Sequence, residues 1–423
     1  MQETLLHHIW KFNKFQSTNL KTTQNQSVVI KSLGQHNLGA GPDFFNAQIN
    51  IDGQLWAGNV EIHIKSSDWY VHHHETDANY DNVILHVVWE HDTDVFRKDN
   101  TAIPTLELKP IVDSKFLNNY NQLFQKQNQW IYCEKDFANV DDFVLSNWLE
   151  RLYFERLEQK SQVIEKLLQK SKNNWEAVLC AMLAKNFGLN INGEAFLSMA
   201  NSMDFSIIRK LQSNQADLEA LFFGQAGLLD KSYQDSHYDD LIKRYTFIKH
   251  KFSLDNTKVL PVQFFRLRPT NFPTIRLSQL ASLYHTRQNL FSSIINCDDL
   301  GSIYKLFEVS TSNYWEAHYN FGTPSRKSKK GLTKSFINLL IINTIVPIQF
   351  AYAKSQGQDI TESIFELINE IPAEKNSIVS KFQGLRFIPN SSGYSQALIQ
   401  LKTAYCDKKK CLQCAVGNAL LNE

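Results

Sequence analysis

The chain is expected to be an α+β protein, with a mixed α/β domain at residues 1–115 and an α-helical domain at residues 116–423. Short runs of alternating apolar and polar residues, separated by turn signals, fill the first quarter of the 423 residues. From residue 145 onward, apolar residues recur at helical spacing with dense charge between them. The length also favours two domains over a single core.

The first domain is predicted to begin with a helix at residues 3–15 and to continue as a sheet. Asp52-Gly53 between two strand patterns is a hairpin signal. The polar residues 68–82 have room for a short helix. The strand candidates are residues 27–33, 44–51, 59–65, 83–90 and 105–108.

The second domain is predicted to be helical because almost no strand pattern follows residue 115. The expected helices are residues 145–170, 175–188, 194–200, 206–224, 239–252, 276–295, 302–308 and 332–354. Within the last of these, the strongly apolar stretch 336–353 contains Pro347 and several polar residues. A buried, Pro-interrupted helix is therefore expected there, rather than a membrane span.

Charge is distributed unevenly along the chain. The net charge is +1, but residues 1–115 hold 9 Lys and Arg against 14 Asp and Glu, and nine of the 13 histidines. An acidic, His-rich segment followed by a basic one fits a metal site beside a surface that binds polyanions. The N-terminus lacks a signal-peptide pattern, and six cysteines without a secretory context indicate the reducing cytoplasm, with no membrane partner.

Residues 41–65 contain the pattern that points to a reaction. Asp43 follows Gly41-Pro42, and Glu61, His63 and Lys65 share one face of the predicted strand 59–65. A turn followed by a solvated strand face would give the same pattern. Asp43 has the parity of the apolar residues in its own strand, so it must precede the regular strand or lie at a bulge to reach the polar face.

These residue types suit a divalent cation. Two carboxylates, Asp43 and Glu61, can anchor Mg²⁺ or Mn²⁺ beside a phosphodiester. The cation lowers the pKa of a bound water and offsets charge that grows on phosphorus. His63 or Lys65 can orient that water or stabilise the developing charge.

Pro42-Asp43 and Glu61-Ile62-His63 resemble the motif of the PD-(D/E)XK nuclease superfamily. The resemblance implies a restriction-endonuclease-like mixed α/β fold for the first domain. It also implies a leading helix that contributes another acidic residue, which here is Glu3. The superfamily usually has Lys where this chain has His63, and Lys65 lies two positions further on.

The longer string through Ser67-Asp68-Trp69 and residues 80–88 is similar to a bacterial protein family of unknown function. That resemblance extends over most of the chain and implies a helical C-terminal region. It implies no activity.

A run of three histidines, 72–74, forms a second constellation with Asp77 and Tyr80. On a helix, His74 and Asp77 would share a face, and imidazoles suit transition metals. His72, His74 or Asp77 is expected to line the active cleft, unless the run is only a polar helix start. His86 lies in an apolar strand and is expected to be a hydrogen-bonded core residue.

Cysteines cluster near the C-terminus at Cys406, Cys411 and Cys414, with Cys133 as the candidate fourth ligand. Thiolates at such spacing bind Zn²⁺ or an iron–sulfur cluster. Reduced thiols near a helix start are the alternative.

Two basic segments are candidates for phosphate contacts, although a solvated loop or ion pairs between the domains would also account for them. One is a Pro-interrupted loop with three arginines, and the other is the densest basic run. Their residues are Arg266, Arg268, Arg276, Arg326, Lys327, Lys329 and Lys330.

The sequence therefore predicts a metal-dependent nuclease, with nucleic acid as partner and DNA as the favoured substrate. A nuclease-like binding or scaffold protein without catalysis is one alternative. A transition-metal hydrolase built around His63, His72, His74 and Asp77 is the other.

Overall fold

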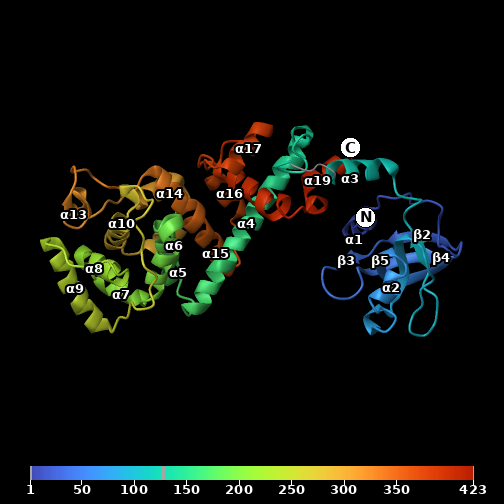
Figure 1. The fold of residues 1–423 in the computed structure, drawn as a ribbon, viewed down its shortest axis with the longest axis horizontal. Coiled ribbons are helices and arrows are strands. Elements are labelled where there is room, and N and C mark those ends of the chain that lie inside the picture. Colours follow the sequence, from blue (N-terminus) through green and yellow to red (C-terminus); the bar gives the residue numbers. More distant parts are fainter. Residues whose placement is uncertain (1, 125–128, 423) are drawn as a thin grey trace. The chain divides into compact units, whose positions relative to one another are not determined.

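The computed structural model describes residues 2–124 and 129–422 (Figure 1). They form two compact units. Unit 1 comprises Met1–Trp148, Gly384–Arg386 and Leu401–Glu423, and unit 2 comprises Leu149–Gln383 and Phe387–Gln400. The domain boundary predicted at residue 115 therefore falls inside unit 1, because the C-terminal segment and residues 116–148 associate with the sheet-bearing part of the chain.

Unit 1 contains the mixed sheet that the alternation predicts. Among the described residues its strands are β1 (Leu20–Lys21), β2 (Ser27–Ser32), β3 (Gln35–His36), β4 (Phe44–Ile51), β5 (Gln54–Lys65), β6 (Val83–Glu90) and β7 (Thr105–Glu107). The order is β1-β2-β4-β5-β6-β7, and β3 pairs with β4. β2, β4 and β5 are antiparallel neighbours, whereas β5, β6 and β7 run parallel.

Helix α1 (Glu3–Lys11) lies against β5, and Figure 1 shows it beside the strands. Leu5, Leu6 and Ile9 are fully buried and form its apolar face. Trp10 donates its indole N–H to the Leu33 carbonyl at 3.0 Å, which fixes the helix against the loop after β2. This packing directs the opposite, polar edge of the helix towards the start of β4.

The remaining helices of unit 1 are short or lie in its later segments. They are α2 (Asp68–Val71), α3 (Ser114–Phe124), the first turns of α4 (Asp142–Lys170) and α19 (Ala415–Asn422). Arg386 donates to the Val140 carbonyl at 2.5 Å, which ties the segment 384–386 into this unit.

Unit 2 is helical, as its periodicity predicts, apart from the short strands β8 (His318–Asn320) and β9 (Thr323–Pro324). Its helices beyond α4 are α5 (Trp175–Phe187), α6 (Leu189–Asn201), α7 (Phe205–Leu211), α8 (Gln215–Gln225), α9 (Ser236–Phe252), α10 (Pro273–Thr286), α11 (Leu290–Ile295), α12 (Leu300–Leu306), α13 (Asn313–Glu316), α14 (Lys334–Leu340), α15 (Val346–Ser355), α16 (Thr361–Asn369), α17 (Ser377–Leu385, whose last residues belong to unit 1) and α18 (Ser392–Gln400).

One apolar segment of unit 2, Lys334–Ser355, is long and apolar enough to cross a membrane by length and composition alone. It comprises α14, a π-helical turn at Ile341–Ile345 and α15, and 78% of its most apolar window is buried inside the protein. A core helix passes the same test, and this burial matches the expected Pro-interrupted core helix.

Candidate functional site

Asp43 and Glu61 lie side by side where β4 begins. The main-chain N–H of Asp43 donates to Glu61 Oε2 at 3.1 Å, and the main-chain N–H of Ile62 donates to Asp43 Oδ2 at 2.9 Å. The strand pairing sets Phe44 opposite Val60, which places the two acidic residues at one level of the sheet. The two carboxylates predicted from the sequence therefore meet in space, although 18 positions separate them.

A bulge explains how Asp43 reaches the polar face. The β4–β5 register is interrupted between Phe44 and Ala47, and Asn46 has a left-handed backbone with φ of 58°. Asp43 itself precedes the strand, so its side chain does not have to follow the alternation of β4. Both conditions expected from its parity are met here.

His63 stands next to Glu61 on the same face of β5, and its exposed fraction is 1%. Its Nδ1 lies 2.8 Å from Nε2 of His86, a fully buried residue of β6. The prediction that His86 is a hydrogen-bonded core residue is thus confirmed. The contact turns His63 Nε2 towards Glu61 and His72, in the manner of outer partners that orient metal ligands.

The three consecutive histidines form a tight turn, because α2 ends at Val71 and His73 has φ of 59°. This left-handed residue reverses the chain, so that His73 faces solvent while His72 and His74 both face His63. His72 Nδ1 lies 3.0 Å from His63 Nε2. A continuous helix over residues 68–82 would have separated these two rings.

Three imidazoles converge at this point, and the Glu61 carboxylate lies beside two of them, those of His63 and His74. The ligand atoms of His63, His72 and His74 all lie within 4.8 Å of one another. Glu61 Oε1 is 3.3 Å from His74 Nε2 and 3.6 Å from His63 Nε2. Adjacent ligands of an octahedral ion with bonds of about 2.1 Å lie roughly 3.0 Å apart, so these separations suit a common cation. His74 also stacks on Tyr80, with ring centroids 3.7 Å apart.

Asp77 does not share a helix face with His74, because the segment breaks into α2 and a 3-10 turn at Ala78–Tyr80. Its Oδ1 accepts the Asn79 main-chain N–H at 2.9 Å, which makes Asp77 the N-cap of that turn. The carboxylate is exposed and acts on His74 only through its charge.

Helix α1 adds two groups to the site. Glu3 is half-buried, and its charge interacts with those of His7, Asp43 and His72. His7, one turn later, places Nε2 3.3 Å from Asp43 Oδ2. Sequence reasoning missed His7, although its i, i+4 spacing from Glu3 puts both on one helix face.

The electrostatics of the site are those of crowded, buried ionisable groups. Burial raises the pKa of Glu61, and the neighbouring charge of Asp43 raises it further. Burial and the surrounding histidines lower the pKa of His63 to about 2, and burial chiefly lowers that of His86 to about 3. Burial opposes a charge on His7, but the hydrogen bond and charge of Asp43 outweigh it and raise the pKa of His7. The imidazoles on the β-sheet are therefore neutral, the form that binds metals.

Lys65 is not brought into this group. It ends β5 with an exposed side chain, its main-chain N–H donates to Asp68 Oδ2 at 2.9 Å, and its charge acts on Asp92. His63 is thus the basic residue that stands beside Glu61.

The predicted phosphate-binding residues belong to unit 2 and divide into two sets. Arg276 was grouped with the Pro-interrupted loop as a phosphate contact but lies in α10, with 8% of its surface exposed, and Lys330 is 6% exposed. Lys330 donates to the carbonyls of Trp315 and Glu316. The other five side chains are exposed: Arg266, Arg268, Arg326, Lys327 and Lys329.

Residues 3–377 match the model of a family described as a protein of unknown function, DUF2851. The chain belongs to this family. The match includes the acid–histidine site, formed by Asp43, Glu61, His63, His72 and His74. It also includes most of the helical unit, as the sequence resemblance implied. No curated protein and no solved structure matches the chain.

Proposed function

We propose that the chain is a metal-dependent phosphodiester hydrolase that acts on nucleic acid, with DNA as the favoured substrate. The observation that carries the proposal is the proximity of Asp43 and Glu61, fixed by the Asp43 N–H bond to the Glu61 carboxylate and the Ile62 N–H bond to the Asp43 carboxylate, with His63 beside Glu61 on β5. The leading helix, the antiparallel strands β2, β4 and β5 and the parallel strand β6 support it. The half-buried Glu3 on the leading helix and the neighbouring Asp43 and Glu61 are the acidic residues on which the proposal rests.

Asp43, Glu61 and the histidines 63, 72 and 74 are the proposed ligand set. Carboxylates alone suit Mg²⁺, but imidazole nitrogens at these separations favour Mn²⁺ or a similar transition metal. When bound, such a cation supplies Lewis-acid stabilisation of charge on the phosphate and a water of lowered pKa.

The chain's own groups then have distinct parts in the reaction. His86 holds the His63 ring in one orientation. His7, whose Nε2 lies 3.3 Å from Asp43 Oδ2, is the proposed proton donor to the leaving oxygen. The exposed basic residues of unit 2 supply candidate contacts to the nucleic-acid backbone.

The test is cleavage of supercoiled plasmid and labelled single-stranded DNA by the full chain with Mn²⁺, Mg²⁺ or EDTA. Asp43→Asn and Glu61→Gln should each lower the cleavage rate by about 10²–10³-fold, a typical loss for removal of one electrostatic group. Glu90→Gln is the matched control, since Glu90 lies exposed at the end of β6 and pairs with Lys109 at 3.4 Å. Cleavage that survives Glu61→Gln would contradict the proposal.

A transition-metal hydrolase acting on another substrate is a second candidate, favoured by the convergence of three imidazoles. It predicts that a transition metal co-purifies and is lost in His72→Ala and His74→Ala, while DNA is not cleaved. A binding protein without catalysis would instead bind DNA with no turnover, and Asp43→Asn would leave that binding intact.

A further inference from the structure

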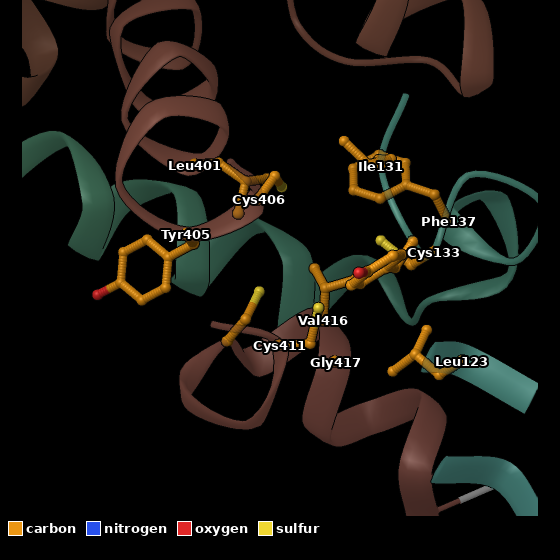
Figure 2. A pocket seen from close by; sticks show the side chains of 12 residues that line it. Leu123, Ile131, Cys133, Phe137, Leu401, Tyr405, Cys406, Cys411, Val416 and Gly417 are labelled. Carbon is orange, nitrogen blue, oxygen red and sulfur yellow. The ribbon is translucent and has the colours of Figure 1, made fainter. Parts of the chain in front are cut away.

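Four of the six cysteines gather in unit 1, outside the acid–histidine site. Cys133 comes from the segment between α3 and α4, and Cys406 ends the π-helical segment Leu401–Cys406. Cys411 and Cys414 lie in the turn before α19. All four line one cavity, and Figure 2 shows Cys133, Cys406 and Cys411 around it. Segments more than 270 positions apart in the chain thus meet at sulfur atoms.

The surroundings of these cysteines are mostly apolar. Besides the cysteines, the lining residues are Leu123, Ile131, Tyr132, Phe137, Leu401, Tyr405, Val416 and Gly417. None of the four thiols forms a disulfide. Burial raises the pKa of Cys133 and Cys406, and the charges of the other cysteines of the group raise it further, so the sulfur atoms are within electrostatic reach of one another.

The backbone around Cys414 is shaped to support a thiolate. The main-chain N–H groups of Val416 and Gly417, in the first turn of α19, hydrogen-bond to the Cys414 sulfur. A Cβ on Gly417 would lie 2.2 Å from the Cys411 carbonyl oxygen, so only glycine lets this turn approach the helix so closely. N–H groups directed at cysteine sulfur are a feature that tunes iron–sulfur sites.

The spacing of the sulfur atoms distinguishes a single ion from a cluster. Four thiolates around one Zn²⁺ with bonds of about 2.3 Å lie roughly 3.8 Å apart. Among the described residues, the one group of three or more ligand atoms that all lie within 4.8 Å of one another is the histidine group. No three of the described cysteine sulfurs therefore lie within 4.8 Å of one another, a spacing wider than one zinc ion requires and one that fits cysteines bound to different iron atoms of a cubic cluster.

We propose that Cys133, Cys406, Cys411 and Cys414 ligate a [4Fe–4S] cluster, which ties the C-terminal segment 401–423 to residues 131–137. On transfer of a preassembled cluster from a thiolate-bound donor, each cysteine sulfur replaces one donor thiolate on iron, and the departing thiolate takes up the cysteine's proton, so one iron–sulfur bond forms as one breaks and no oxidation state changes. The proposal is independent of the hydrolase function, because metal content and not cleavage is its readout.

The first experiment is anaerobic purification of the full chain, with iron, acid-labile sulfide and zinc measured before and after reconstitution with ferric iron, sulfide and a thiol reductant, which supplies the electrons that convert part of the iron to the ferrous state. The expected result is about four iron and four sulfide per chain, with the broad visible absorbance of such clusters. Stoichiometric zinc that iron and sulfide do not replace would overturn the proposal, as would a chain that takes up no iron.

Variants locate the cluster. Cys411→Ser and Cys414→Ser should lose most of the iron and sulfide, whereas Cys297→Ser should keep both, because Cys297 belongs to unit 2 and does not line the cavity. Retention of the full cluster in Cys414→Ser would contradict the ligand assignment.

A measurement on the wild type avoids variants that fail to fold. Hydrogen exchange over Ala415–Asn422 should be slow with the cluster and at least tenfold faster after its removal by oxidant and chelator. Equal exchange in the two states would overturn the proposed tie to the C-terminal segment.

Discussion

Buried ionisable groups occur in both units, but their neighbours differ. A buried charge in unit 2 has neutral hydrogen-bond partners, whereas the buried groups of unit 1 lie beside other ionisable groups. In unit 2, Arg276 donates to Gln279 Oε1 at 2.9 Å and to Asn271 Oδ1 at 2.6 Å, and its guanidinium lies 3.6 Å from the centroid of the Phe336 ring. Each contact satisfies a donor with a neutral group. The charge is costly to bury, and two of the three guanidinium nitrogens have hydrogen-bond partners, whereas Nε has none among the described residues.

In unit 1, Glu61 is buried beside a second carboxylate, Asp43, and beside imidazoles with lowered pKa values. These groups raise one another's free energy in the metal-free protein, because like charges and desolvation both oppose ionisation. The difference teaches that Arg276 is held by contacts within unit 2, whereas the crowded acidic and imidazole groups of unit 1 lack such compensation and are the basis of our proposal that a cation binds there.

The largest expected effect is opposite changes in activity and stability on Glu61→Gln. DNA cleavage should fall by about 10²–10³-fold. The metal-free variant should nevertheless be more stable at pH 7, by about 1–2 kcal/mol, because a carboxyl whose pKa is raised on folding loses stability as the pH rises above its unfolded value. Urea denaturation in EDTA measures this, and a marked loss of stability would count against the comparison.

Arg276→Met should lower the stability of the protein, in contrast to Glu61→Gln. It leaves Asn271 and Gln279 without their charged donor, so the free energy of unfolding should drop by about 2–4 kcal/mol. Arg326→Met, at an exposed position, is the control and should change stability by less than about 0.5 kcal/mol. A DNA-binding defect in Arg276→Met without any loss of stability would show that this arginine serves the ligand instead.

Two adjacent histidines of α1, His7 and His8, have surroundings that differ in the same way. His7 faces Asp43, whereas His8 packs against Phe12 and Phe116, and burial lowers the pKa of His8 to about 4. The unfolded chain then takes up this proton first, so stability is complete above about pH 6.5 and falls by about 2–3 kcal/mol as the pH drops towards 4.

His8→Phe should remove most of that loss. The check is urea denaturation of wild type and variant at pH 7 and pH 4.5. An identical acid-induced loss in the two proteins would mean that His8 is not the group that titrates.

The smallest effects are expected at the exposed basic residues. Lys327→Ala and Lys329→Ala should each weaken DNA binding a few-fold at every sequence and lower the salt slope by about 1, if each contacts one phosphate. Fluorescence anisotropy over a salt series measures this. An unchanged slope in both variants would assign the run to a solvated loop.

The fold was predictable where local pattern decides it. β4 and β6 have the predicted bounds, because alternation and buried β-branched runs are strong local signals. The single helix expected over residues 206–224 is divided at Asn214, whose side chain caps α8, and a cap of this kind competes with helix continuation. β1 and β3 have two residues each, so their pairing depends on neighbours that no local pattern reveals.

The site was predictable in its acidic pair but not in its surroundings. Asp43 and Glu61 follow from residue type, and the bulge needed by Asp43 follows from parity. The meeting of His63 with His72 depends on the left-handed turn at His73, and the contribution of His7 depends on how α1 docks on the sheet. Lys65 was expected on the polar face but lies at the exposed end of β5. These outcomes are set by tertiary packing.

The most direct test of the central claim is anomalous diffraction from crystals of the full chain grown with Mn²⁺. The account predicts one strong manganese peak within bonding distance of the Glu61 carboxylate and of at least one nitrogen of His63, His72 or His74. A manganese-loaded crystal with no peak between these side chains, or with manganese bound only at the protein surface, would contradict it.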